Sequence, residues 1–464
     1  MSARSRRAVA LVAVAFLLVA GGLAALYLTN RREVTTTSAK AYEAYEEGVA
    51  NERRFYMKEA QVAYAKALEL DPNFAMAMLR LAGHSNREQA VSLIDRAARL
   101  RGRLTERERL YVDMAQGQMS GNPEARDKAA QTIRARYPED VDAAMVLAGK
   151  EMTKGNAERA LQIYSELIAI DPNNAGVYNQ IGYYYAWRGD YDKAMENLKK
   201  YQFMAPDQAN PYDSLGEVQA FSGHYEEAIK NLNRALALKP DFFESYGHLG
   251  VAYEGMGDYP KAIENYLRGA LECVIDGRRG DFLGQALRVA FRSGDKAAFK
   301  QIVQKIAELP RDKSYELTTA YAAAVTSLLD GQPAETERRL KELRPKLDAA
   351  FQQDMKGTPY KPYFPRWNTL MSLAKARQGK TDEAMALDEE VINPPIPWGS
   401  FEGRRYVYEG RARLAEILAR KGDLDRAEKL LAENNRWNPN WAPTKPAEEV
   451  VSQLRREKVL AASH

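Results

Sequence analysis

Residues 175–206 have the sequence AGVYNQIGYYYAWRGDYDKAMENLKKYQFMAP, and residues 209–240 have the sequence ANPYDSLGEVQAFSGHYEEAIKNLNRALALKP. In both stretches a glycine separates two amphipathic halves and a proline ends the second half. Glycine accommodates the left-handed conformation that often ends a helix, whereas proline does not continue one. Each stretch therefore predicts two helices joined by a turn, at Gly189 in the first and Gly223 in the second, with Asp190 placed to cap the helix that follows.

The turn glycine and the closing proline recur at a fixed interval of 34 residues. The glycines are Gly121, Gly155, Gly189, Gly223 and Gly257, and the prolines are Pro138, Pro172, Pro206 and Pro240. Small residues such as Gly182 and Ala194 let the two helices of one copy approach closely. A period of this length indicates a stack of helix pairs in which each pair buries its apolar face against its neighbours.

The repeated pattern resembles the tetratricopeptide repeat (TPR) family, in which an aromatic residue, Leu-Gly, a second aromatic residue, alanines and a proline stand at fixed offsets. The matching residues of one copy are Tyr246, Leu249, Gly250, Tyr253, Ala262 and Tyr266. The resemblance implies an all-α fold, a right-handed α-solenoid of TPR hairpins. We expect about six to seven repeats over 41–274, divergent helical repeats with proline–aromatic loops over 275–404, and a TPR-like repeat with a capping helix over 405–464.

The N-terminus indicates a membrane segment. A short basic tail, 1–7, precedes the uncharged stretch 8–28, whose length as a helix, about 31 Å, matches the hydrocarbon core of a bilayer. A cleaved signal peptide is the alternative, with a small-residue site at 22–24. The apolar run continues past that site and favours an uncleaved transmembrane helix, followed by a linker at 29–40. Arginines before the segment favour the N-terminus inside, which predicts a single-pass protein of a bacterial inner membrane with periplasmic repeats.

A second resemblance covers roughly residues 35–275. The stretches 41–45 (AYEAY), 67–77 (ALELDPNFAMA) and 104–111 (LTERERLY) are similar to the repeat region that follows the membrane helix in some bacterial serine/threonine kinases and related signalling proteins. Because seven residues precede the apolar segment, no kinase domain is expected and kinase activity is not carried over.

The sequence contains few residues or motifs that would indicate catalysis or metal binding. The chain has four histidines and one cysteine, and it contains no His-x-x-x-His, Cys-x-x-Cys, Walker or Gly-x-Ser-x-Gly pattern. The sequence therefore predicts no catalytic residues, no metal and no cofactor. Cys273 is interpreted as a packing residue, and His248 is expected on the face that often lines the groove of such repeats. The net charge of +4 and the interleaved acids and bases give no basic block for nucleic acid.

The expected working surface is the concave groove of the three most regular copies, over 175–274. The TPR resemblance implies that certain first-helix positions face it, and these positions carry aromatic, amide and acidic side chains. They are Asn179, Tyr183, Trp187, Asn210, Asp213, Glu217, Phe221, Glu244 and Glu254. Packing between adjacent first helices is the alternative for each aromatic residue. The acids predict an extended protein or peptide partner with basic and apolar side chains.

Three functions are therefore compared. The first is a non-enzymatic, membrane-attached scaffold or sensor that binds protein partners through the groove. The second is an assembly or quality-control factor for envelope proteins, which would use the same groove to hold clients. The third is an enzyme with an unrecognised site in 275–404. The absence of a recognisable catalytic pattern disfavours the third, so the first is the expected function, with the second as its alternative.

Overall fold

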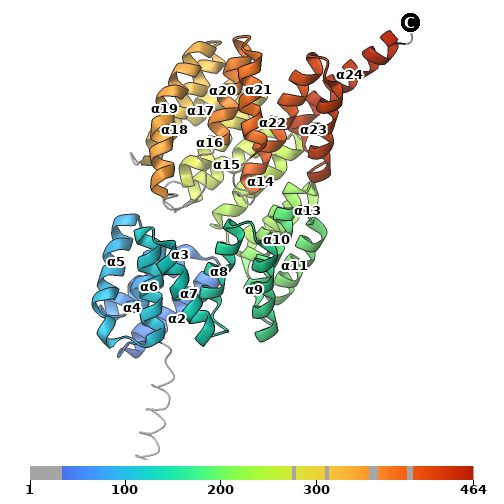
Figure 1. Cartoon of the computed structure of the whole chain (residues 1–464). Coiled ribbons are helices and arrows are strands. Elements are labelled where there is room, and N and C mark those ends of the chain that lie inside the picture. The colour runs from blue at the N-terminus through green and yellow to red at the C-terminus, as the bar shows by residue number, and fades with distance from the viewer. Residues whose placement is uncertain (1–33, 274–277, 309–312, 355–363, 394–400, 463–464) are drawn as a thin grey trace, which may run out of the picture. The chain divides into compact units, whose positions relative to one another are not determined.

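The computed structural model describes residues 34–273, 278–308, 313–354, 364–393 and 401–462. Over these residues the chain is an all-α solenoid of helical hairpins, with 23 α-helices, two short 3-10 helices and no strand (Figure 1). It divides into two compact units, residues 1–133 and 134–464. The expected all-α solenoid is thus confirmed.

Unit 1 contains three consecutive hairpins. Its helices are α2 (Ala39–Arg53), α3 (Met57–Leu70), α4 (Ala75–Gly83), α5 (Arg87–Arg99), the 3-10 helix η1 (Arg101–Arg103), α6 (Glu106–Ser120) and α7 (Pro123–Arg136), which reaches the unit boundary. The residues before α2 are tied to this unit, because Thr35 donates from its backbone nitrogen and hydroxyl to the Glu108 carboxylate at 2.6 and 2.5 Å. Glu108 also completes a capping box with Thr105 at the start of α6.

Unit 2 continues with hairpins of similar length and then longer, less regular helices. The regular set is α8 (Val141–Thr153), α9 (Ala157–Ile170), α10 (Ala175–Arg188), α11 (Tyr191–Met204), α12 (Ala209–Phe221), α13 (Tyr225–Leu238), α14 (Phe243–Met256) and α15 (Tyr259–Glu272). The later set is α16 (Arg278–Ser293), α17 (Lys296–Ala307), α18 (Lys313–Leu329), α19 (Pro333–Asp354), α20 (Pro365–Arg377), α21 (Thr381–Ile392), α22 (Phe401–Arg420), α23 (Leu424–Trp437), η2 (Ala442–Thr444) and α24 (Lys445–Ala462).

The repeated small residues explain why each pair of helices packs so closely. A Cβ atom on Gly182 of α10 would lie 2.6 Å from Leu198 of α11, and one on Gly216 of α12 would lie 2.7 Å from Leu232 of α13. The chain turns between α10 and α11 at Gly189, whose φ of 78° is left-handed, and the Asp190 side chain accepts from a backbone N–H of α11. The predicted turn and cap are therefore confirmed.

The membrane placement predicted from the sequence is corrected by the helices themselves. Across the described part of the chain, no helix combines the length and the apolar character that crossing a bilayer requires. The longest described helix, α19, spans 22 residues but carries charged side chains along most of its length. The prediction of a single-pass bacterial inner-membrane protein with periplasmic repeats is therefore wrong on this finding. The tail 1–7 and the apolar segment 8–28 lie outside the described residues.

Within unit 2, the C-terminal helices contact the regular hairpins that lie more than 200 residues earlier. Arg404 at the start of α22 donates to the Trp187 backbone carbonyl and, at 3.0 Å, to the Tyr191 hydroxyl. After α23, Asn438 donates to the Phe221 carbonyl at the end of α12. The last helices thus pack along the ends of α10 and α12, where the chain turns.

The proline–aromatic segments are only partly described. The stretches 355–363 and 394–400 lie outside the described residues. Of the remaining aromatic residues, Trp367 donates from its indole nitrogen to the Leu340 carbonyl at 2.8 Å, and the Arg344 guanidinium lies 5.1 Å from the Phe364 ring centre and 5.2 Å from that of Trp367. These two rings therefore pack against α19.

Candidate functional site

The nine residues predicted to line the groove lie on α10, α12 and α14, and most of them are engaged within the chain. Six are buried, with exposed fractions of 9% or less, while three are half-buried. The buried residues are Asn179, Asn210, Asp213, Glu217, Phe221 and Glu254, and the half-buried ones are Tyr183, Trp187 and Glu244. The structure does not test whether they bind a partner, so that role stays a prediction.

Two of the predicted acids form a polar cluster with His248. His248 Nδ1 lies 2.9 Å from an Asp213 carboxylate oxygen, and its Nε2 lies 3.6 Å from a Glu217 oxygen. The Tyr183 hydroxyl donates to the other Glu217 oxygen at 2.6 Å. The structure thus brings together three predicted residues on α10 and α12 around a histidine of α14.

The charge state of this cluster follows from its burial and its acids. Burial disfavours a charged imidazole, yet the neighbouring carboxylates of Asp213 and Glu217 raise the pKa of His248 to about 10. His248 is therefore a cation at neutral pH, and the two carboxylates give the cluster a net charge of about −1. Burial, followed by the Glu217 charge, raises the pKa of Tyr183 well above its ordinary value, so this hydroxyl remains a donor.

The cluster is not arranged for nucleophilic catalysis. Ser245 lies nearby, but its hydroxyl donates to Asp213 Oδ1 at 2.6 Å, which is the same oxygen that faces His248 Nδ1. An activated serine would donate to the histidine itself, with the acid on the far ring nitrogen. In the described chain there is also no group of three or more His, Cys, Asp and Glu side chains that would hold a metal ion. Cys273 is buried in the apolar core.

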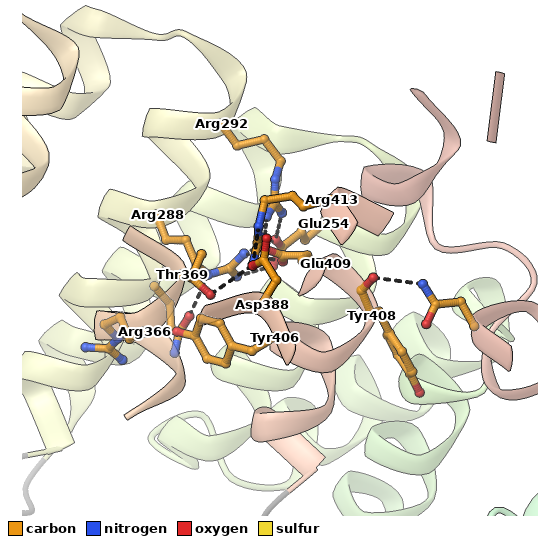
Figure 2. A network of polar contacts seen from close by, with 12 residues as sticks. Glu254, Arg288, Arg292, Arg366, Thr369, Asp388, Tyr406, Tyr408, Glu409 and Arg413 are labelled. Atoms are coloured by element: carbon orange, nitrogen blue, oxygen red, sulfur yellow. Dashed lines mark hydrogen bonds and ion pairs between the residues drawn. The ribbon is translucent and has the colours of Figure 1, made fainter. Parts of the chain in front are cut away.

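A second polar cluster surrounds Glu254, which lies near the C-terminal end of α14 (Figure 2). Arg288 of α16 binds both Glu254 carboxylate oxygens at 2.6 Å and approaches Glu409 of α22 at 3.1 Å. Arg292, one turn later, pairs with both acids as well. Burial opposes ionisation of Glu254, but Arg288 and Arg292 lower its pKa to about 2. This box of two acids and two arginines joins α14, α16 and α22.

The other predicted residues have separate partners. The Asn210 amide donates to the Tyr201 hydroxyl at 3.0 Å, and Glu244 pairs with Arg278 at 2.6 Å. Phe221 is 1% exposed and contributes its backbone carbonyl to Asn438. Asn179 packs in the interior without joining either cluster.

Sequence reasoning missed Arg288, although the repeat itself contained a signal for it. Equivalent positions of successive first helices face one another, so hydrogen-bonded pairs stand one period apart. Tyr183 with Glu217, Glu244 with Arg278, and Glu254 with Arg288 are each separated by 34 residues. The period therefore extends one copy beyond Val274, where the glycine and proline marks become irregular. Glu409, Arg404 and Asn438 carry no such signal, because they lie outside the period.

The stacked hairpins and their paired inner positions define a helical-repeat protein. Models of the family described as TPR repeat and tetratricopeptide repeat match residues 222–257 and 114–175. These two stretches are therefore tetratricopeptide repeats. Repeats of this family generally bind protein partners and are typically non-enzymatic, so the fold indicates a protein-interaction scaffold.

Several solved structures are similar to this chain. A chain in the crystal structure of the APC/C hetero-tetramer Cut9–Hcn1 is 14% identical, with a TM-score of 0.46 over 89% of this chain and 76% of that one. Yeast Tom70 is 12% identical, with a TM-score of 0.39 over 90% and 96%. MamA is 29% identical over 35% of this chain and 95% of its own, with a TM-score of 0.28. The family, rather than any of these chains, indicates the role.

Proposed function

We propose that the protein is a non-enzymatic scaffold whose inner face, formed by α10, α12 and α14, binds an extended protein segment with basic and apolar side chains. The half-buried residues Tyr183, Trp187 and Glu244 are the first points of contact for such a segment. The rings supply apolar area, and the carboxylate pairs with a cationic side chain.

The observation that carries this proposal is the way in which the chain's own Arg404 binds the end of α10. Its guanidinium donates to the Trp187 carbonyl and to the Tyr191 hydroxyl, and it lies 4.4 Å from the centre of the Trp437 ring. A guanidinium is therefore accommodated at the edge of this face by a carbonyl, a hydroxyl and an aromatic ring. The net negative charge around Asp213 and Glu217 favours the same kind of side chain nearby.

The test uses the full chain and two synthetic peptides that share one apolar pattern. In one peptide arginine alternates with leucine, and in the other glutamate replaces each arginine. We expect the arginine peptide to bind, with an affinity that falls as salt rises, because exposed charges are screened. Glu244→Gln should weaken binding, whereas Glu264→Gln, which changes an exposed acid on α15, should not. Equal binding of the two peptides, or no effect of Glu244→Gln, would contradict the proposal.

Charge reversal at Asp213 or Glu217 is not a suitable binding test. Both carboxylates are buried against His248, so a lysine at either position would place unpaired positive charges together in the interior. Such variants would report on folding. Tyr183→Phe is a milder change, because it removes the hydroxyl that donates to Glu217 and keeps the ring that a partner would contact.

A further inference from the structure

A short segment of the C-terminal part contacts three consecutive turns of the regular hairpins. They are the turns at Gly189, Gly223 and Gly257. A Cβ atom on the first glycine would lie 2.5 Å from the Trp437 ring, and one on the third would lie 3.4 Å from the Ala442 Cβ atom. Between them, Asn440 donates to the carbonyl of the second glycine at 3.2 Å. The segment 437–442 therefore runs along the edge of the solenoid where these hairpins turn.

Helix α22 contacts the same part of the solenoid. Arg405 donates to the Tyr266 hydroxyl of α15 at 3.2 Å, and Glu409 forms ion pairs with two arginines of α16 (Figure 2). We call residues 404–409 and 437–442 together the clasp. The clasp thus joins residues that are more than 100 positions apart in the chain.

The clasp shares its points of attachment with the candidate face. Arg404 donates to the backbone carbonyl of Trp187, and Asn438 donates to that of Phe221. The stretch 404–408 has the sequence RRYVY, so it carries the basic and apolar side chains that are expected of the partner segment. The clasp and a partner of this chemistry would therefore compete for the ends of α10 and α12.

The closed clasp leaves several buried polar groups unsatisfied. Arg405 is 1% exposed and makes one hydrogen bond, to a neutral hydroxyl, while its Nε and Nη2 atoms have no hydrogen-bond partner in the described part of the chain. The indole nitrogens of Trp187 and Trp441 are also buried without a partner. Such groups destabilise the closed state, most of all the charge of Arg405, whereas water would satisfy them once the clasp opened.

The regular hairpins keep their own contacts when the clasp is open. The close packing of Gly182 against Leu198 lies within one hairpin. Glu254 stays paired with Arg288 and Arg292 when the acid of α22 leaves, so opening leaves no buried acid without a partner. Stacked repeats are stabilised by their neighbours, and parts of a protein can open without global unfolding. The hairpins therefore do not need the clasp to remain folded.

We propose that the clasp is an autoinhibitory contact, which covers the ends of α10 and α12 when closed and opens as a unit to admit the partner segment. The inference rests on the proposed function, because it assigns the regulation of the same face. A partner that binds only the open state shifts the equilibrium toward it. Its apparent affinity is reduced in proportion to the fraction of molecules that are open.

A reversible disulfide tests the clasp within one protein. A Cβ atom on Gly257 would contact only the Ala442 Cβ atom, at 3.4 Å, which is close to the spacing of the two Cβ atoms in a disulfide. The double variant Gly257→Cys, Ala442→Cys should therefore hold the clasp closed when oxidised and release it when reduced. The strain of a side chain at the left-handed turn is present in both forms, so it does not affect their comparison.

The probe is the peptide in which arginine alternates with leucine. We expect it to bind the oxidised double variant at least tenfold more weakly than the reduced one, whereas Gly257→Cys alone should bind equally under both conditions. Equal affinity of the two forms would overturn the autoinhibition. Failure of the peptide to bind either form would contradict the proposed function, and hydrogen exchange then decides whether the clasp opens.

Hydrogen exchange of the wild-type full chain measures opening without a peptide. The amides of 434–444 should exchange at least tenfold faster than the slowest amides of α12–α15, because the clasp opens while the hairpins stay folded. Arg405→Met removes the unpaired charge and keeps the apolar stem, so it should slow exchange in 434–444 at least fivefold. Arg420→Gln, which changes an exposed arginine of the same helix, is the matched control and should exchange like the wild type.

Two results of this measurement would reject the clasp as a unit that opens. One is exchange in 434–444 of the wild type that is as slow as the slowest exchange in α12–α15, since the clasp would then open only with global unfolding. The other is exchange in Arg405→Met that is as fast as in the wild type or faster, because the unpaired charge would then not favour opening.

Discussion

The side-chain amide of Asn438 donates a 3.1 Å hydrogen bond to the backbone carbonyl of Phe221, which stands 217 residues earlier in the chain. The same amide accepts from the Tyr225 hydroxyl at 3.1 Å through its oxygen. The last carbonyl groups of a helix have no N–H donor within that helix. Where such carbonyls are buried, a donor from another part of the chain is needed. Asn438, together with Asn440, which donates to the Gly223 carbonyl at 3.2 Å, thus joins the C-terminal segment to the turn between α12 and α13.

The first prediction concerns this contact. Asn438→Ala should destabilise unit 2 by about 1–3 kcal/mol, because it removes the buried hydrogen bonds to the Phe221 carbonyl and from the Tyr225 hydroxyl. The measurement is chemical denaturation, together with hydrogen exchange of the amides at the start of α13. Asn197→Ala is the control, since the Asn197 amide binds only a carbonyl of its own helix. Equal stability of the two variants would show that the long-range bond contributes nothing.

The second prediction concerns the acid–arginine box. Glu254→Gln should lower the free energy of unfolding by about 3–5 kcal/mol, because Arg288 and Arg292 would then share one buried acid, Glu409. Denaturant midpoints at neutral pH provide the measurement. Glu264→Gln, which alters an exposed acid on α15, should leave the midpoint unchanged. A small effect at Glu254 would mean that water reaches the box and screens it.

The third prediction is a pH dependence that arises from His248. Its pKa is raised from about 6.5 to about 10 on folding, so its contribution is fully present below pH 6.5 and is lost as the pH rises through 10. We expect the wild type to lose about 2–5 kcal/mol over this interval from this group. The charged groups acting on the ring are Asp213 and Glu217 of α12 and Glu244 of its own helix, and Tyr183 of α10 donates to Glu217.

His248→Gln should therefore be less stable than the wild type near pH 6 and should lose less stability between pH 6.5 and 10. His224→Gln, which changes an exposed histidine at the start of α13, is the control and should keep the wild-type slope. Unfolding midpoints measured across the interval provide the data. Parallel profiles for the wild type and His248→Gln would exclude the predicted cation.

The fourth prediction concerns the close contact between helices of one repeat. Gly216→Ala should destabilise the protein by about 1–3 kcal/mol, because the added Cβ would meet Leu232 at 2.7 Å. Gly149 is the matched control, since it also lies within a helix, α8, but a Cβ there meets nothing within 4 Å. Gly149→Ala should stabilise by about 0.5–1 kcal/mol through helix propensity. Thermal unfolding provides the measurement: Tm should fall for Gly216→Ala and rise for Gly149→Ala.

The regular part of the fold was predictable because its determinants lie within one repeat or between adjacent repeats. The turn at Gly189, the cap at Asp190 and the tight contact at Gly182 depend on residues less than 34 positions apart. The step from Glu254 to Arg288 extends the same rule by one copy. A local pattern specifies such contacts because neighbouring hairpins have nearly the same geometry.

Whether the side chains of the candidate face are buried or exposed could not be predicted in this way. The sequence indicates which side chains share the inner positions, but it does not show that six of the nine are buried. Later residues contribute to the surroundings of Glu254 and Phe221, and the bonds from Arg404 to the Trp187 carbonyl, from Arg288 to Glu409 and from Asn438 to the Phe221 carbonyl follow no repeat. The sequence alone determined the helical hairpins, their caps and their stacking. The tertiary structure alone decided which polar groups meet across more than 100 residues, because such contacts depend on where the chain returns rather than on any local period.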